Sequence, residues 1–138
     1  MLNETVVTLQ GWMGGDVQLR RAGDAPVAHF RVACTPRRFR RSSNEWVDGD
    51  TQWFTVNAWR GLADNCDRSL RRGDPVVVHG RLSARTYVNS GGVEVTAFEV
   101  EALFVGHDLT KGVSRFTKAA RPVTAVEEDE TAGAAEPR

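Results

Sequence analysis

Turn-forming clusters divide the sequence into short runs, and this division constrains the fold more than any other feature. Clusters of Gly, Asn, Asp and Ser occur at 14–16, 23–24 and 89–92, and such clusters are typical of tight turns. Between them, apolar and polar residues alternate or β-branched residues accumulate, which favours strands. The pattern predicts about five strands, over residues 4–12, 26–34, 52–60, 75–88 and 93–105.

One segment, 62–72, has the period of a helix. Leu62, Cys66 and Leu70 recur four residues apart, with acidic residues early, arginines late and Gly73 following, a pattern that predicts a helix ending at this glycine. The order is therefore three strands, a helix and two strands. It predicts an all-β fold, a five-stranded Greek-key barrel of the OB type with one short α-helix between its third and fourth strands.

The barrel is expected to occupy residues 1–110, and 111–138 is expected to be a flexible, disordered acidic tail. The chain has 18 basic and 18 acidic residues; division after Arg121 gives 17 − 13 = +4 for the body and 1 − 5 = −4 for the remainder. Overall neutrality therefore does not exclude a nucleic-acid partner. A long polar excursion, 35–51, is expected to be a functional or mobile loop.

The parity of residues along each strand separates the expected core from the expected outer face, because successive side chains point to opposite sides. The inward parity is expected for Phe30, Val32, Cys34, Phe54, Val56, Ala58, Val76, Val78, Gly80, Leu82 and Ala84. The outward parity is expected for His29, Arg31, Ala33, Trp53, Thr55, Asn57, Trp59, His79, Arg81, Ser83, Arg85 and Tyr87.

Aromatic rings and arginines thus share the expected outer face. Flat rings stack on any base, and guanidinium groups neutralise phosphates, so this composition favours single-stranded nucleic acid. An exposed tryptophan can equally mark a subunit interface, but such interfaces are depleted of clustered like charge. The expected stacking residues are Trp53, Trp59, Tyr87 and Phe39. The expected phosphate contacts are Arg31, Arg37, Arg38, Arg40, Arg41, Arg81 and Arg85.

Several motifs occur in order along residues 3–107. They are Gly11 with Gly14-Gly15-Asp16, the runs 27–33, 51–63 and 70–82, and Arg85-Thr86-Tyr87. In these motifs the chain resembles the bacterial single-stranded DNA-binding protein family. The resemblance implies a homotetramer that binds and protects single-stranded DNA without sequence preference, during replication, recombination, repair or chromosome segregation. It implies no catalysis and no cofactor. A cytoplasmic, nucleoid-associated protein is expected, because the sequence shows neither a membrane span nor a secretory signal.

The resemblance also bears on single positions. It implies base stacking by Trp53, Trp59 and Tyr87, and a fourth stacking position that falls on Phe39 when two residues are inserted and on Arg37 without a gap. Trp12 stands where the family usually carries a small polar residue, so a structural or interfacial role is expected for it.

The end of the chain departs from the family pattern. The family usually ends in an acidic tip closing on Pro-Phe, which docks repair proteins. Here the acidic run 127–130 is internal and the sequence closes on Glu136-Pro137-Arg138. We therefore expect a shorter paralogue with weak or no recruitment of repair proteins through this end.

Cys34 and Cys66 fall on expected core positions, so inert buried thiols are expected, and a disulfide within or between subunits is the alternative. The histidines, His29, His79 and His107, show no metal-binding spacing, so neither a metal site nor an enzyme is predicted. No run approaches the ~20 apolar residues of a membrane span, and the first residues do not resemble a secretory signal. A second functional hypothesis is an OB-fold adaptor of the primosome type or an RNA-binding module.

Overall fold

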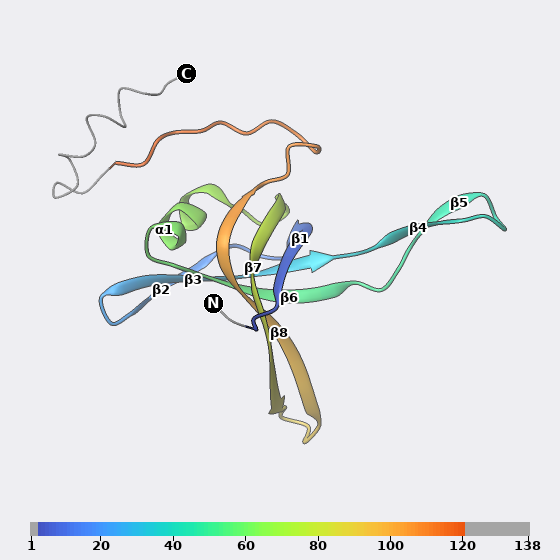
Figure 1. Cartoon of the computed structure of the whole chain (residues 1–138), viewed down its shortest axis with the longest axis horizontal. Helices are drawn as coiled ribbons and strands as arrows, with labels where there is room; N and C mark the ends of the chain where they lie inside the picture. The colour runs from blue at the N-terminus through green and yellow to red at the C-terminus, as the bar shows by residue number, and fades with distance from the viewer. Residues whose placement is uncertain (1–2, 121–138) are drawn as a thin grey trace.

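The computed structural model describes residues 3–120 and contains a closed barrel of five strands (Figure 1). The strands of the ring follow one another in the order β1-β7-β8-β6-β3, and β1 pairs again with β3 to close it. All neighbours are antiparallel except β6 and β8. This arrangement is the OB-type Greek-key barrel, as predicted. The strands are β1 (Val6–Met13), β3 (Ala25–Cys34), β6 (Gln52–Trp59), β7 (Pro75–Val88) and β8 (Glu94–His107).

The barrel interior is built from aliphatic side chains on the inward parity. The largest fully buried side chains are valines: Val32, Val56, Val76, Val78 and Val100. β-Branched residues suit this position because they pack well on a pleated surface. The inward assignment fails at Ala84, which is exposed. Beyond Leu82 the long β7–β8 hairpin extends away from the barrel (Figure 1), so neither of its sides faces a core.

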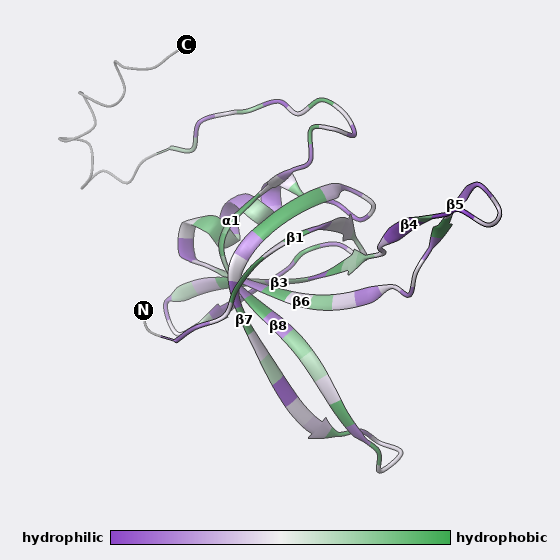
Figure 2. Cartoon of the chain, turned by 45° about the vertical axis from the view of Figure 1, so that its right-hand side comes forward, coloured by the Kyte–Doolittle hydropathy of each residue, from purple (hydrophilic) through white to green (hydrophobic). Residues whose placement is uncertain are grey.

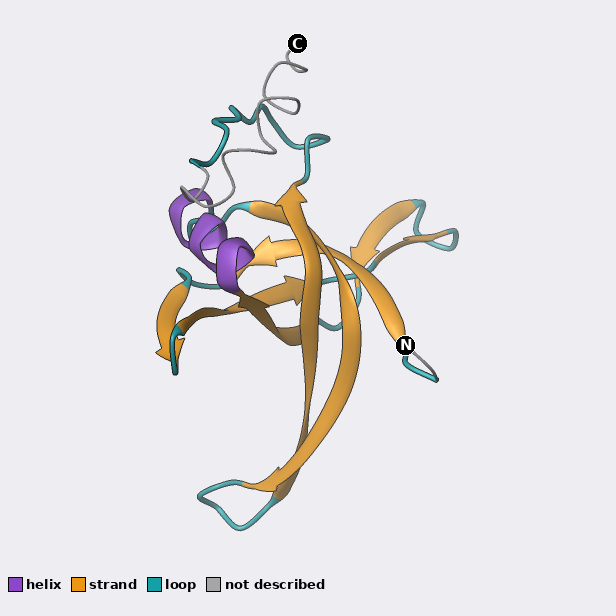
Figure 3. Cartoon of the chain, turned by 60° about the vertical axis from the view of Figure 1, so that its left-hand side comes forward, coloured by secondary structure: helices purple, strands orange, loops and turns teal. Residues whose placement is uncertain are grey.

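The helix α1 (Arg60–Ser69) packs at one end of the barrel (Figure 3). Its buried residues include Cys66, and Leu70 just beyond it is also buried, so the predicted apolar stripe is confirmed. The predicted bounds were wrong: the helix starts at Arg60 and has no acidic residue in its first turn. It ends at Ser69, and Leu70 is extended, with φ −105° and ψ 141°. Arg68 therefore falls in the last turn, while Arg71 and Arg72 lie beyond the helix. Gly73 lies in the following turn with φ 90°, a conformation that favours glycine.

Two short antiparallel hairpins extend the barrel strands, and the sequence analysis missed both. β2 (Gln18–Ala22) pairs with β3, and all of its residues are exposed, so it lacks a clear alternating pattern. The predicted loop 35–51 contains a second hairpin, β4 (Arg37–Arg40) with β5 (Glu45–Asp48). Two cross-strand pairs stabilise it: Arg37 forms an ion pair with Asp48 (3.0 Å), and the ring of Phe39 lies 5.5 Å from that of Trp46. We call residues 37–48 the β4–β5 arm, since they project from the barrel (Figure 1).

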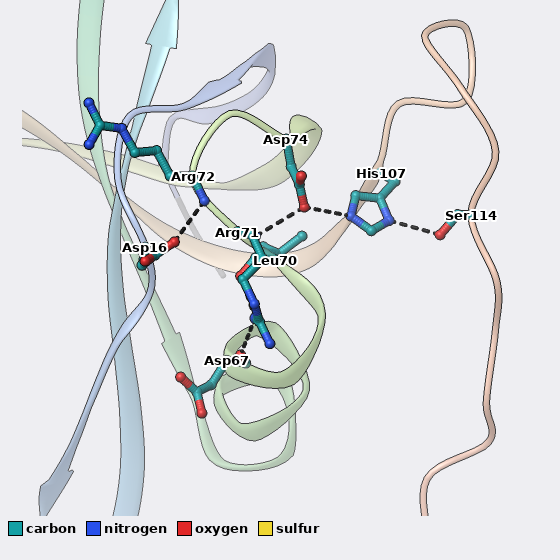
Figure 4. Close-up of polar contacts among 8 residues, drawn as sticks. All are labelled: Asp16, Asp67, Leu70, Arg71, Arg72, Asp74, His107 and Ser114. Carbon is teal, nitrogen blue, oxygen red and sulfur yellow. Dashed lines mark hydrogen bonds and ion pairs between the residues drawn. The ribbon is translucent and has the colours of Figure 1, made fainter.

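Side-chain contacts tie the segment after β8 to the barrel. The pKa of Asp108 is lowered to about 2 by hydrogen bonds from Gln10 Nε2 (2.7 Å) and from Thr110. The His107 ring lies between Asp74 Oδ2 (3.1 Å) and Ser114 Oγ (2.8 Å), as Figure 4 shows. Residues 109–120 form no helix or strand. The acidic run 127–130 and the chain end, on which the tail prediction depends, lie outside the described residues.

Candidate nucleic-acid interface

Two indoles lie on the outer side of β6, as predicted from strand parity. Trp53 is 46% exposed and Trp59 is 44% exposed. β3 and β8 flank β6 on its two sides. We call the outward side chains of these three strands the barrel face. Large, half-exposed rings on a rigid sheet are suited to stacking against flat ligands.

Trp53 is held in place by contacts with two neighbouring segments. The guanidinium carbon of Arg31 lies 4.8 Å from the centroid of the indole ring, a cation–π arrangement. On the turn after β1, a Cβ added to Gly14 would lie 2.5 Å from Cζ3 of Trp53, so the indole packs directly against the glycine backbone. Any larger residue at position 14 would therefore displace the ring.

Trp59 is held by a hydrogen-bond network that the sequence did not reveal. Its Nε1 donates to Glu101 Oε1 (2.9 Å), while Asn57 Nδ2 donates to Glu101 Oε2 (3.0 Å) and more weakly to Glu99 Oε1 (3.4 Å). His29 Nδ1 lies 2.7 Å from Asn57 Oδ1, and it must donate because this amide oxygen can only accept. Asn57 has the predicted outward parity but is only 8% exposed, since these partners cover it.

Two carboxylates therefore lie on the barrel face among the aromatic rings. Glu99 and Glu101 sit on β8 directly opposite Thr55 and Asn57 of β6. Their outward position could have been predicted from the sequence, because Phe98, Val100 and Ala102 take one parity along the last strand and the two glutamates take the other. Glu99 is paired with Arg85 (3.0 Å), whereas Glu101 forms no ion pair among the described residues, so a phosphate beside Glu101 would be disfavoured.

The predicted phosphate-binding arginines fall into two classes. Three form ion pairs within the chain: Arg37 with Asp48 (3.0 Å), Arg81 with Glu4 (3.8 Å) and Arg85 with Glu99 (3.0 Å). Exposed pairs of this kind contribute only about 0 to 1 kcal/mol, so a phosphate can displace the carboxylate. Among the residues that the structure describes, Arg31 and the arm residues Arg38, Arg40 and Arg41 form no ion pair and are exposed.

The two other predicted stacking residues lie on separate extensions of the barrel. Tyr87 is 46% exposed near the tip of the β7–β8 hairpin, and Phe39 is 43% exposed on the β4–β5 arm. The structure thus places two of the predicted rings on the barrel face and leaves the others on projections that point in different directions (Figure 1). Within one chain the four residues do not form a single patch.

Trp46 is a further exposed ring that the sequence analysis missed. It is 59% exposed and lies across from Phe39, with ring centroids 5.5 Å apart in an edge-on arrangement. The guanidinium carbon of Arg37 lies 5.9 Å from its centroid. Figure 2 shows that the arm is largely hydrophilic, with short hydrophobic stretches along it. Had a hairpin been expected across 35–51 in place of a loop, Phe39 and Trp46 would have been predicted to face each other.

Both cysteines are free thiols in the structure. Burial raises the pKa of Cys66 to about 11 and also raises that of Cys34, so both favour the unreactive thiol form. The two cysteines form no disulfide with each other in the structure. Over residues 3–120, no group of three or more His, Cys, Asp or Glu side chains is placed to hold a metal ion. No helix in this part of the chain is long and apolar enough to cross a membrane.

Comparison with known proteins agrees with this geometry. The model of the "Single-strand binding protein family" matches residues 4–108. "Single-stranded DNA-binding protein 2" of Streptomyces coelicolor is 43% identical over 119 residues, which are 86% of this chain and 60% of that protein. The "Single-stranded DNA-binding protein" of Corynebacterium glutamicum is 44% identical over 79% of this chain and 49% of its own length. The chain thus matches about half to three fifths of the length of these two relatives.

Solved structures show the same similarity. The small single-stranded DNA-binding protein from S. coelicolor superposes with a TM-score of 0.75 at 40% identity, covering 80% of this chain and all of that one. The second such protein from Mycobacterium smegmatis gives a TM-score of 0.62 at 33% identity, covering 83% of this chain and 99% of that one. The family model covers the whole barrel, including both indoles of the barrel face. The chain belongs to the single-strand binding protein family.

Proposed function

We propose that this protein binds single-stranded DNA without sequence preference and protects it during replication, recombination or repair. The observation that carries the proposal is the barrel face, where Trp53 and Trp59 expose nearly half of their surface and Arg31 lies over the ring of Trp53. Base stacking on such rings contributes roughly 1 to 3 kcal/mol per base. The exposed arginines of the arm would bind phosphates of the same strand.

The polar groups between the rings explain why the proposed binding tolerates any sequence. Asn57 uses both of its donor hydrogens and its oxygen within the network, and Trp59 donates to Glu101. Reading a base requires hydrogen-bonding groups that are free to meet its edge. Here these groups are committed to one another, so stacking without base reading is favoured.

We further propose that four copies assemble and bind DNA together, as the family resemblance implies. Exposed apolar side chains elsewhere on the barrel support subunit contacts: Val6 is 44%, Leu103 45% and Phe104 58% exposed. Exposed apolar patches of this kind are typical of protein interfaces. The proposed activity would place the assembly with the chromosome in the cytosol.

We propose no catalytic role for the Asp74–His107–Ser114 chain, although its composition is that of a hydrolytic triad. Asp74 Oδ2 also accepts the backbone N–H of Arg71 (3.0 Å), as Figure 4 shows, so this carboxylate orders the turn that leads into β7. His107 then connects that turn to Ser114 beyond β8. The three groups therefore act as a structural link between segments of the chain.

Fluorescence titration tests the proposed function. Oligo-dT should quench the tryptophan emission at low salt, and log affinity should fall with log salt by about 0.7 for each phosphate neutralised. Oligonucleotides of mixed sequence should compete with oligo-dT to within a few fold. Absence of quenching and of competition would contradict the proposal. Preference for oligo-U over oligo-dT would instead support the RNA-binding hypothesis.

A further inference from the structure

Trp12 lies in one cross-strand row with Trp53. On β1, Trp12 is the partner of Ala33, and Ala33 on β3 is in turn the partner of Trp53 on β6. Cross-strand partners point to the same side of a sheet, with Cβ atoms about 5 Å apart. Two indoles, each 46% exposed, therefore flank a single small alanine side chain.

The turn after β1 strengthens this link between the two indoles. Gly14 lies two residues after Trp12, its backbone N–H donates to Arg31 O (2.9 Å), and its Cα faces the ring of Trp53. Arg31 itself lies over that ring. The end of β1 is thus packed against the stacking residue and its cation, and the barrel face continues onto it.

The surroundings of Trp12 distinguish a nucleic-acid contact from a contact with a second copy. Along β1, the next outward side chains are Gln10, which donates to Asp108 (2.7 Å), and Thr8, which is hydrogen-bonded to His79 (2.8 Å). These polar groups separate Trp12 from the exposed Val6 at the other end of the strand. The apolar surface around Trp12 therefore does not continue along β1. It continues across the sheet, to Ala33 and Trp53 on one side and to Pro75 of β7 on the other.

We propose that Trp12 is an additional base-stacking residue, which extends the barrel face across β3 onto β1. The inference rests on the proposed binding of single-stranded DNA. It gives Trp12 a role in that binding, in place of the structural or interfacial role expected from the sequence. Bases stacked on Trp12 and on Trp53 would lie on the two sides of Ala33, over β1 and over β6. The DNA would then cross β6, β3 and β1 in turn.

A variant with Trp12 as its only tryptophan tests the proposal directly. The chain has four tryptophans, so W46F, W53F and W59F together leave Trp12 as the single reporter while keeping an aromatic ring at the other positions. Saturation with oligo-dT, followed independently by the anisotropy of a fluorescently labelled oligonucleotide, should lower the Trp12 emission at least twofold. Saturated binding with unchanged emission would overturn the proposal. Failure of the unmodified protein to bind oligo-dT would contradict the proposed function itself.

Affinity and oligomeric state complete the test. W12A should bind oligo-dT about tenfold more weakly, W12F should bind nearly as well as the unmodified chain, and the exposed control L19A should not differ from it. Light scattering should give the same mass for W12A and the unmodified chain. A reduced mass for W12A, with DNA affinity lost in proportion to dissociation, would show that Trp12 is covered by a second copy and would overturn the proposal.

Discussion

The barrel face and the β4–β5 arm carry the same residue types but hold them in different ways. On the barrel face, Trp59 and Asn57 are fixed by hydrogen bonds to the neighbouring strand, above a core of fully buried valines. The strands of the arm pair only with each other. At its base, Thr35 and Thr51 share a hydrogen bond of 2.7 Å and Gly49 N donates to Pro36 O (2.7 Å).

This difference separates two contributions to binding. Rings that are fixed before binding lose little conformational freedom when a base stacks on them, so the barrel face should supply most of the stacking energy. The arm carries Arg38, Arg40 and Arg41 without ion pairs among the described residues, so it should supply most of the salt-dependent energy. Variants of the barrel face and of the arm should therefore affect stacking energy and salt dependence separately.

The largest effect is expected from removal of both rings on the barrel face. The double variant W53A/W59A should lose roughly 2 to 6 kcal/mol of binding free energy for oligo-dT, because each ring stacks on one base. Phe39→Ala with Trp46→Ala should lose less, since the arm holds its rings less firmly. Equal losses from the two double variants, in titrations at one salt concentration, would contradict the division.

Stability must be measured beside that loss of affinity. W53A/W59A should keep most of its free energy of unfolding in urea, because both rings are half-exposed. Val56→Ala, which opens a cavity among fully buried side chains, should cost about 2 kcal/mol or more. If W53A/W59A were as unstable as V56A, unfolding rather than the loss of stacking would account for its weaker binding.

The next effect concerns the interior of the barrel and its pH dependence. Burial raises the pKa of Cys66 to about 11 from its ordinary value of 9.0, so the folded state retains this proton where the unfolded state releases it. The free energy of unfolding should therefore fall between pH 9 and 11, by up to about 2 kcal/mol. Urea unfolding of Cys66→Ala should show a flatter profile over this range. Identical pH profiles for the variant and the unmodified protein would contradict the assignment of this pH dependence to Cys66.

A smaller effect is expected from the charges of the arm. Replacing Arg38, Arg40 and Arg41 together by Gln should make the salt dependence of binding shallower by about 2, at about 0.7 per phosphate contact. Arg81→Gln with Arg85→Gln should change the slope by less per residue, since each of these arginines must first leave a carboxylate. An equal change per residue would remove the distinction between paired and unpaired arginines.

The smallest effect is expected at the acidic strip of β8. Glu99→Gln should strengthen binding roughly twofold at low salt, because it releases Arg85 and removes a negative charge from the barrel face. The variant keeps an oxygen that can accept from Asn57. Weaker binding of oligo-dT by this variant would show that Glu99 supports the DNA contact instead of opposing it.

Strand parity predicted the barrel and its two exposed indoles because one side of each strand faces a continuous apolar core. The same argument failed at Ala84, where the hairpin has left the core, and at β2, where all residues are exposed. The covering of Asn57 was not predictable from its own strand, because it depends on Glu99 and Glu101, which are about forty residues away in sequence. Pairing within the arm joins residues across a turn, Arg37 with Asp48 and Phe39 with Trp46, and the parity of a single strand does not detect such pairs.

The central claim is that binding energy comes from bases stacked on the barrel face. It is tested most directly by comparing oligo-dT with an abasic oligonucleotide of the same length, about 30 nucleotides, and the same charge, at one salt concentration. We predict that the abasic strand binds at least a hundredfold more weakly and quenches little tryptophan emission, because it offers phosphates without rings. Equal affinity for the two strands would contradict the claim and would assign the binding to arginine–phosphate contacts alone.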